Sequence, residues 1–159
     1  MRKLLLLVMM CVCVPIGALA ATTDLKNDQG QVVARLTVDG NSAVLEVIVA
    51  NASISYNDKG QLNNLTDVKV TGYMPQGIFN VNQYQNGLRS CTRLDLSEVT
   101  DYPSGNFDLS QNSSISGLIL PSNADFSAIN SSSVKYIIKS NTGDSEENAV
   151  EVCVKNGTD

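Results

Sequence analysis

Two aspartates, Asp101 and Asp108, come nearest in this chain to a catalytic pair, because they flank the short loop 102–107. Paired carboxylates can cleave a glycosidic bond when one acts as general acid and the other as nucleophile or base. A general acid needs a raised pKa, and acidic surfaces often carry such pairs without any catalytic role. The pair therefore predicts a secreted carbohydrate-active enzyme as an alternative function, not as the main one.

The chain contains no histidine. This excludes the Ser-His-Asp triad, the Cys-His pair and the usual zinc hydrolase site. A serine with a lysine base remains conceivable, but neither the serines 131–133 near Lys135 nor Ser140 beside Lys139 lies in a recognisable nucleophile motif. We therefore predict a protein that is not an enzyme and that holds no cofactor.

Asp144, Glu146 and Glu147 offer hard oxygen ligands within the segment 141–148, as calcium loops do. The segment lacks the ordered Asp spacing and the Gly position of an EF-hand loop. The preferred interpretation is a hydrated hairpin tip, with calcium as the alternative.

Residues 1–20 have the pattern of a secretory signal peptide, with a basic pair, an apolar run and small residues at the end. The pattern predicts cleavage between Ala20 and Ala21. Residues 21–159 then form a single β-rich domain that is exported to a periplasm or to the extracellular space.

An uncleaved membrane anchor is the alternative, because the apolar run 4–21 just reaches the length of about 18 residues that a spanning helix needs. Pro15 and Gly17 would break such a helix near its end and expose the cleavage site. We therefore expect cleavage, and no membrane insertion of the mature chain.

Cys91 and Cys153 are the two cysteines that remain after cleavage, since Cys11 and Cys13 leave with the signal peptide. In an oxidising compartment an isolated pair indicates a disulfide. Such a bond would contribute about 4 kcal/mol by constraining the unfolded chain. Both cysteines share the charged face of their expected strands, so we predict a clip on the outer side of a sheet or beneath a covering loop. A soft-metal site is disfavoured because it would lack further ligands.

The formal net charge of −5 falls to −7 when the two cations Arg2 and Lys3 leave with the signal peptide. Phosphate backbones and anionic membranes would be repelled by this charge, so nucleic acid is not an expected partner.

The expected partner is an unidentified protein or a surface glycan. Sugar-binding β domains usually present flat aromatic platforms, but this chain has no tryptophan and only five tyrosines. Tyr73, Tyr84, Tyr102 and Tyr136 could line a face, although scattered tyrosines in β proteins more often serve packing. A protein partner is therefore preferred to a glycan.

Alternating or β-branched apolar residues predict six or more short strands separated by turn signals. The expected strands are 31–38, 43–49, 67–73, 88–96, 134–139 and 149–155. The first two form a hairpin around Asp39-Gly40-Asn41. Ser122 and Asp125 resemble a helix start, so a short helical turn is expected there.

The expected fold is all-β, a small antiparallel β-sandwich or barrel with long Ser- and Asn-rich loops, at most a short helical turn and one disulfide. The expected function is that of an exported, non-enzymatic β-domain with a binding, adhesion or structural interaction role. A pilus or adhesin subunit that assembles through sheet-edge pairing is a further alternative.

Overall fold

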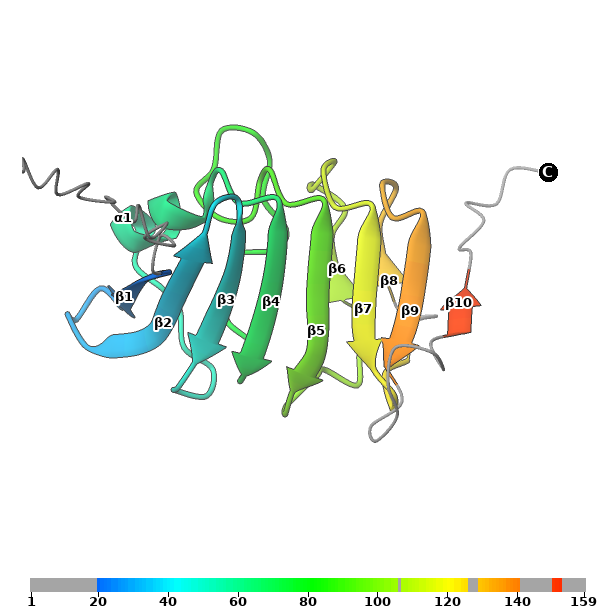
Figure 1. The fold of residues 1–159 in the computed structure, drawn as a ribbon, viewed down its shortest axis with the longest axis horizontal. Helices are drawn as coiled ribbons and strands as arrows, with labels where there is room; N and C mark the ends of the chain where they lie inside the picture. Colours follow the sequence, from blue (N-terminus) through cyan, green and yellow to red (C-terminus); the bar gives the residue numbers. More distant parts are fainter. Residues whose placement is uncertain (1–19, 106, 126–128, 141–149, 153–159) are drawn as a thin grey trace, which may run out of the picture.

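The computed structural model describes residues 20–105, 107–125, 129–140 and 150–152. One sheet of eight strands spans the molecule, in the order β1-β2-β3-β4-β5-β7-β9-β10 (Figure 1). Its strands are β1 (Ala21–Lys26), β2 (Val32–Asp39), β3 (Ser42–Val47), β4 (Asp67–Gly72), β5 (Arg93–Val99), β7 (Gly117–Pro121), β9 (Tyr136–Ser140) and β10 (Val150–Val152). Neighbours from β3 to β9 are parallel, whereas β1, β2 and β10 add antiparallel strands at the two edges.

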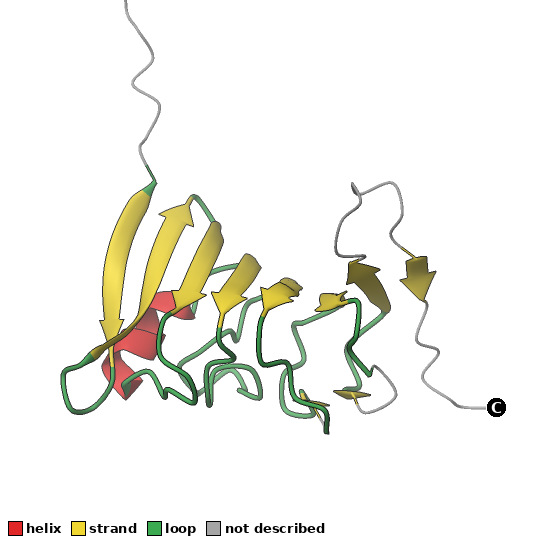
Figure 2. Cartoon of the chain, turned by 90° about the horizontal axis from the view of Figure 1, so that it is seen from below, coloured by secondary structure: helices red, strands yellow, loops and turns green. Residues whose placement is uncertain are grey.

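Each connection between parallel strands crosses to the other side of the molecule before the chain returns to the sheet. On that side β6 (Phe107–Asp108) and β8 (Ile129–Asn130) pair in parallel, and an isolated parallel bridge joins Ser53 to Gln76. Figure 2 shows the sheet along one side and the loops with the β6–β8 pair along the other. The chain therefore winds as a β-solenoid of about three turns.

The prediction of an antiparallel sandwich or barrel is wrong, although the chain is mostly β. The β2–β3 hairpin is confirmed as antiparallel, but the strands after it are parallel. Alternation of apolar and polar residues has the same period in both kinds of sheet, so it does not distinguish them. The short helix α1 (Tyr56–Lys59) lies after β3, not after Ser122, and a 3-10 turn, η1 (Gly60–Leu62), follows it.

The core consists of apolar side chains stacked from turn to turn. In register, Ala43, Val68, Leu94, Leu118 and Ile137 follow one another from β3 to β9. The last four of these are fully buried. Burial of one such side chain contributes about 1.5–3 kcal/mol to the stability of the fold. Each turn of the solenoid adds one side chain to this apolar column and so adds a contribution of this size.

A ladder of hydroxyl groups fixes the stacking of the turns just before their strands. Thr92 Oγ1 donates to the carbonyl oxygen of Thr66 at 3.0 Å, and Ser116 Oγ donates to the carbonyl oxygen of Thr92 at 3.2 Å. The backbone amides of Thr92 and Ser116 donate to the same two oxygens. The side chain and main chain together therefore hold β4, β5 and β7 in one register.

Cys91 is a buried free thiol, and the part of the chain that the structure describes contains no disulfide, contrary to the expected fold. It lies in the turn before β5, where the alternation assumed for 88–96 does not hold, and points into the core instead of the charged face. Its Sγ lies 3.1 Å from the carbonyl oxygen of Arg93. Burial raises the pKa of this thiol to about 12. Cys153 lies outside the described residues.

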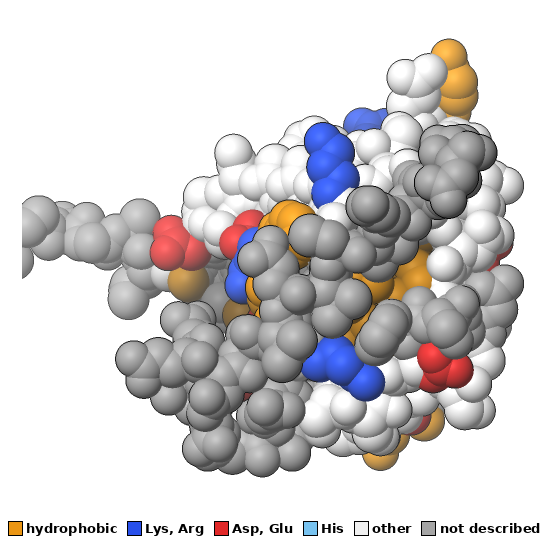
Figure 3. Space-filling model, turned by 90° about the vertical axis from the view of Figure 1, so that its right-hand side faces the viewer, with side chains coloured by type: hydrophobic (Ala, Val, Ile, Leu, Met, Phe, Trp, Pro, Cys, Tyr) orange, Lys and Arg blue, Asp and Glu red, His pale blue; other side chains and the backbone are white. Residues whose placement is uncertain are grey.

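The two ends of the solenoid differ. At the β1 end, Asp58 of α1 accepts a hydrogen bond from the backbone amide of Lys26, and the amide of Ser55 donates to the Lys26 carbonyl. Figure 3 views the β9–β10 end, where hydrophobic side chains are visible between the residues drawn in grey.

β1 begins at Ala21, and both Ala20 and Ala21 are exposed. A cut between them would leave β1 whole, but residues 1–19 lie outside the described part of the chain. The described residues form no helix that is long and apolar enough to cross a membrane.

Candidate functional site

The outer face of the sheet carries the side chains that point away from the core, and it is largely charged. Arg35 lies between Asp24 at 3.6 Å and Glu46 at 3.5 Å, on three neighbouring strands. Lys69 of β4 pairs with Glu98 of β5. Exposed ion pairs contribute only about 0–1 kcal/mol each, so this pattern affects recognition more than stability.

Asp95 is a buried carboxylate on β5 that stabilises an irregularity in the sheet. It accepts hydrogen bonds from the backbone amide of Ser97 at 2.9 Å and from Ser97 Oγ at 2.6 Å. The register between β4 and β5 shifts beside it, between Lys69 and Thr71. Oδ1 of Asp95 is therefore occupied by the backbone amide and the hydroxyl group of Ser97.

Arg93 is ionised and held by a neighbour on β4. Its Nη1 lies 2.8 Å from Oδ1 of Asp67. Burial lowers the pKa of Arg93, but the hydrogen bond that Arg93 donates to Asp67 and the negative charge of Asp67 outweigh burial, so the pKa ends above its ordinary value. The guanidinium therefore keeps its charge and a fixed position on the outer face.

Next to Arg93, an apolar area interrupts the charged pattern. Arg93, Gly117 and Tyr136 are register partners on β5, β7 and β9, and the ring of Tyr136 lies over Gly117, which has no side chain. One row along, Ile119 and Ile138 are register partners and are partly exposed. We call Arg93, Ile119, Tyr136 and Ile138 the Tyr136 patch.

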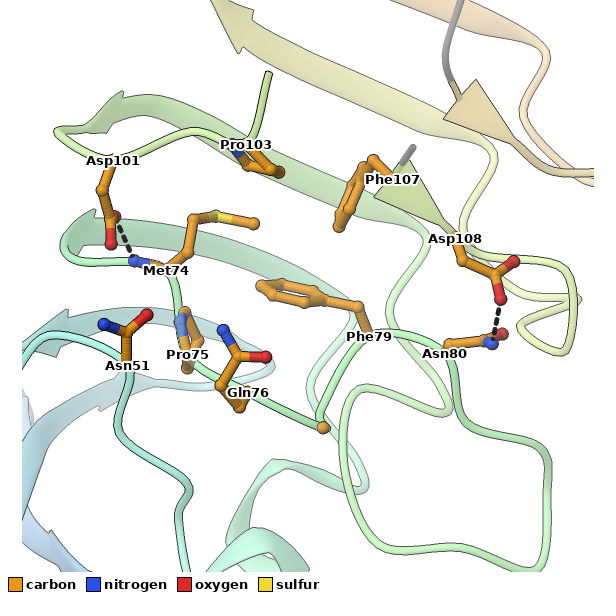
Figure 4. A pocket seen from close by; sticks show the side chains of 11 residues that line it. Asn51, Met74, Pro75, Gln76, Phe79, Asn80, Asp101, Pro103, Phe107 and Asp108 are labelled. Atoms are coloured by element: carbon orange, nitrogen blue, oxygen red, sulfur yellow. Dashed lines mark hydrogen bonds between the residues drawn. The ribbon is translucent and has the colours of Figure 1, made fainter. Parts of the chain in front are cut away.

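A second feature, the loop-side pocket, is a cavity of about 350 Å³ on the opposite side of the solenoid (Figure 4). It lies between successive turns and combines apolar with polar walls. Its lining residues are Asn51, Met74, Pro75, Gln76, Gly77, Phe79, Asn80, Asp101, Pro103, Phe107 and Asp108. Phe79 and Phe107 pack edge to face beneath it, with ring centroids 5.3 Å apart.

The structure brings Asp101 and Asp108 to this one pocket, but at opposite ends of it (Figure 4). Asp101 Oδ1 accepts a hydrogen bond from the backbone amide of Met74 at 2.6 Å. Asp108 accepts from Asn80 Nδ2 at 2.7 Å and from Asn130 Nδ2 at 3.1 Å. Both carboxylates therefore join successive turns of the solenoid.

The pKa of Asp108 is lowered, chiefly by the hydrogen bond from the backbone amide of Ser110, which favours the ionised form. A general acid requires the opposite shift, because it must still hold its proton at working pH. The electrostatic environment of Asp108 thus disfavours the acid role in a glycosidase.

Of the serines 131–133, Ser132 and Ser133 line a hollow of about 540 Å³ together with Lys135, whereas Ser131 does not line it. Ser133 Oγ donates to the carbonyl oxygen of Asn112 at 2.7 Å, and Ser114 Oγ donates to that of Arg89 at 2.6 Å. These two hydroxyl groups therefore join the loop to the backbone of neighbouring turns.

The calcium candidates Asp144, Glu146 and Glu147 belong to segment 141–149, which lies outside the described residues. Within the described ranges, no group of three or more His, Cys, Asp or Glu side chains could hold a metal ion.

Sequence reasoning missed the Tyr136 patch because it did not align the parallel strands. The sequence nevertheless contains a repeated five-residue pattern, in which a hydroxyl residue at the first position is followed by apolar residues at the third and fifth positions. It occurs at Thr66–Val70, Thr92–Leu96 and Ser116–Leu120. Stacking these segments places Asp67, Arg93 and Gly117 side by side.

Comparison with known proteins gives no match to a family, a curated protein or a solved structure.

Proposed function

We propose that this chain is an exported, non-enzymatic binding module that contacts another protein through the Tyr136 patch on the outer face of its sheet. The observation that carries the proposal is the placement of Arg93 and Tyr136 on either side of Gly117. Tyrosine and arginine are among the residues that most often dominate binding energy at interfaces. Ile119 and Ile138 add apolar area beside them.

The rigidity of the sheet supports this role. Solenoids present extended surfaces that bind partners, and their turns stack without large rearrangement. The hydroxyl ladder of Thr66, Thr92 and Ser116 and the ion pair between Asp67 and Arg93 hold the patch in place before binding. A preordered surface loses less conformational entropy when it meets its partner.

A protein fits the patch better than a polyanion does. Three cations, Arg35, Lys69 and Arg93, are each paired with a carboxylate on this face. A nucleic acid would have to displace those carboxylates and overcome the acidic charge of the chain. A protein surface can instead pair with both signs and cover the apolar area.

Export is part of the proposal and rests on the pattern of residues 1–20. The non-enzymatic character is supported by the lowered pKa of Asp108 and by the structural hydrogen bonds of both pocket carboxylates. Pairing through a sheet edge is less favoured, because charged side chains and the Lys26–Asp58 contact protect β1.

The experiment compares binding of the exported chain to the surface fraction of its source cells. Arg93→Glu reverses a charge in the patch, whereas Arg89→Glu makes the same change at a partly buried arginine in the loop before β5. We expect Arg93→Glu to weaken binding at least tenfold and Arg89→Glu to leave it near the wild-type value. Equal binding by all three proteins would refute the proposed surface.

A further inference from the structure

The loop-side pocket holds hydrogen-bonding groups that the fold does not use. Asn51, Gln76 and Asp101 are exposed at the mouth of the pocket, and among the described residues the amides of Asn51 and Gln76 make no hydrogen bond to the protein, while Asp101 uses one of its two carboxylate oxygens. Figure 4 shows all three on the same side of the pocket, near Met74 and Pro75. This corner therefore offers two amides and one carboxylate oxygen to a ligand.

Each of these groups is positioned by backbone contacts between turns. The backbone amide of Gln76 donates to the carbonyl oxygen of Ala52 at 2.9 Å, next to Asn51. Asn51 itself has a φ of 56°, a left-handed conformation that asparagine tolerates better than most residues. Asp101 is held against the amide of Met74. The three groups come from three successive connections, so the backbone that carries them is in place before any ligand arrives.

Between this corner and the polar end formed by Asn80 and Asp108, the wall of the pocket is apolar. Met74, Phe79 and Phe107 are buried and form its inner wall, and Pro103 lies across from them. A ligand bound here would place one side against hydrocarbon and aromatic groups while its polar groups reach the amides. Pockets that bind small molecules commonly combine an apolar wall with a few convergent polar groups.

The hydrogen-bond donors and acceptors that line the pocket favour a neutral ligand over a charged one. An anion would approach the carboxylates of Asp101 and Asp108, which repel it. A cation would contact the carboxylates and the amide oxygens of Asn51 and Gln76, but it would make no use of their N–H donors. A neutral polyhydroxyl compound supplies both donors and acceptors, and its C–H faces suit the apolar wall.

We propose that the loop-side pocket binds a neutral sugar ring, either as a free saccharide or as the end of a glycan. The site is separate from the Tyr136 patch and lies on the opposite side of the solenoid. The inference does not depend on the proposed function, and it would give the chain two binding surfaces.

The test is titration of the isotope-labelled full-length exported chain with glucose, mannose, galactose and N-acetylglucosamine, followed by nuclear magnetic resonance. Glucosamine and glucuronate serve as cationic and anionic comparators. We expect at least one neutral sugar to shift the side-chain amide signals of Asn51 and Gln76. Larger shifts from either charged comparator, or no shift from any neutral sugar, would overturn the proposal.

The matched variants are Gln76→Ala in the pocket and Gln29→Ala in the exposed β1–β2 turn. Loss of one hydrogen-bonding amide should weaken binding about tenfold in the first variant and leave it unchanged in the second. Equal affinity of the two variants would contradict the assignment. The Arg93→Glu protein should bind the sugar with wild-type affinity. A loss of sugar binding by the pocket can therefore be distinguished from a loss of protein binding by the Tyr136 patch.

The affinity for the free sugar can be compared with the affinity for an oligosaccharide that ends in the same sugar. This comparison shows whether the pocket binds a free saccharide or the end of a glycan. Binding of both with similar affinity indicates a site for the free saccharide ring. Binding that is much tighter for the oligosaccharide indicates a glycan, with contacts beyond the pocket.

Discussion

The ring of Tyr136 occupies the space that a side chain at Gly117 would fill. A Cβ added to Gly117 would lie 2.0 Å from Cζ and 2.1 Å from the hydroxyl oxygen of Tyr136. Because Gly117 lies between Arg93 and Tyr136 in the register of the sheet, this glycine leaves room for the end of the tyrosine ring above β7. The shape of the Tyr136 patch therefore depends on a residue that has no side chain.

Gly117→Ala should reduce binding without unfolding the protein. The added methyl group would meet the far end of a flexible side chain, which can swing away, so we expect the free energy of unfolding to change by less than about 1 kcal/mol. Binding should weaken as much as in Tyr136→Ala, because the ring leaves its position in both. Denaturant titration and the cell-surface binding assay measure the two effects.

Gly105→Ala is the matched control for this change, since nothing lies within 4 Å of a Cβ there. It should affect neither stability nor binding. A Gly117→Ala protein that binds like the wild type would show that the position of the Tyr136 ring does not matter.

Gly72→Ala should destabilise the fold strongly. Gly72 ends β4 with a φ of +77°, and a Cβ there would lie 2.3 Å from the carbonyl oxygen of Val47, a backbone atom of the neighbouring strand. Backbone cannot move aside as a side chain can, so we expect a loss of more than about 2 kcal/mol in the free energy of unfolding.

Gly30→Ala separates the cost of the positive φ from the cost of the contact with the Val47 carbonyl oxygen. Gly30 has a similar φ of +79° but open space around it. It should cost only about 1 kcal/mol, the penalty for a left-handed backbone. Urea titration of both variants measures the difference, and equal losses would show that the contact with Val47 contributes nothing.

The stability of the protein should fall between pH 9 and pH 12 because of Cys91. Burial raises the pKa of its thiol from 9.0 to about 12 in the folded protein, so the folded state favours the protonated form. Above pH 9 the unfolded chain loses this proton while the folded chain keeps it. The free energy of unfolding therefore decreases as the pH rises, by at most about 1.4 kcal/mol per pH unit.

Urea titrations at pH 8, 9 and 10 on the wild type and on Cys91→Ala measure this contribution as a difference in slope. The same burial predicts that iodoacetamide modifies Cys91 only after unfolding, which peptide mapping can follow. Rapid modification of Cys91 in the native protein at pH 8 would show that the thiol is accessible.

The sequence predicts most strands of the large sheet but misses β1 and β7, and it does not predict how the strands pair. Leu94 and Leu96, two residues apart in the expected strand 88–96, are both buried, since local alternation reports which side chains face the core. The direction of the neighbouring strand depends on where the chain goes in between. After β5 that path enters segment 97–133, whose content of Ser, Asn, Asp and Gly predicts long loops with short elements.

Those polar residues instead build the second side of the solenoid. Asn112 is almost completely buried, and its amide nitrogen donates to the carbonyl oxygens of Phe79 and Leu88 at 2.9 and 3.0 Å. Asp108 likewise joins Asn80 to Asn130 across three turns. Composition cannot reveal such pairings, because they join residues that are far apart in the sequence.

For Asp101 and Asp108 too, the sequence does not reveal hydrogen bonds to residues that are far away in the chain. Their proximity in sequence predicted a shared location, and both do line the loop-side pocket. Their use as hydrogen-bond acceptors for Met74 and Asn80 depends on neighbouring turns of the solenoid. The repeated pattern at Thr66, Thr92 and Ser116 was the available clue, with strands that recur at intervals of about 25 residues.

The central claim is that a protein partner contacts the Tyr136 patch. Its most direct test is photo-crosslinking in the source cells, with a photoreactive amino acid at position 138 in the patch or at position 84 on the loop side. Tyr84 is 82% exposed and so provides an accessible control. We predict one discrete protein adduct from position 138 that Arg93→Glu abolishes and that position 84 does not form. Adducts of the same partner from position 84, or none from position 138, would contradict the account.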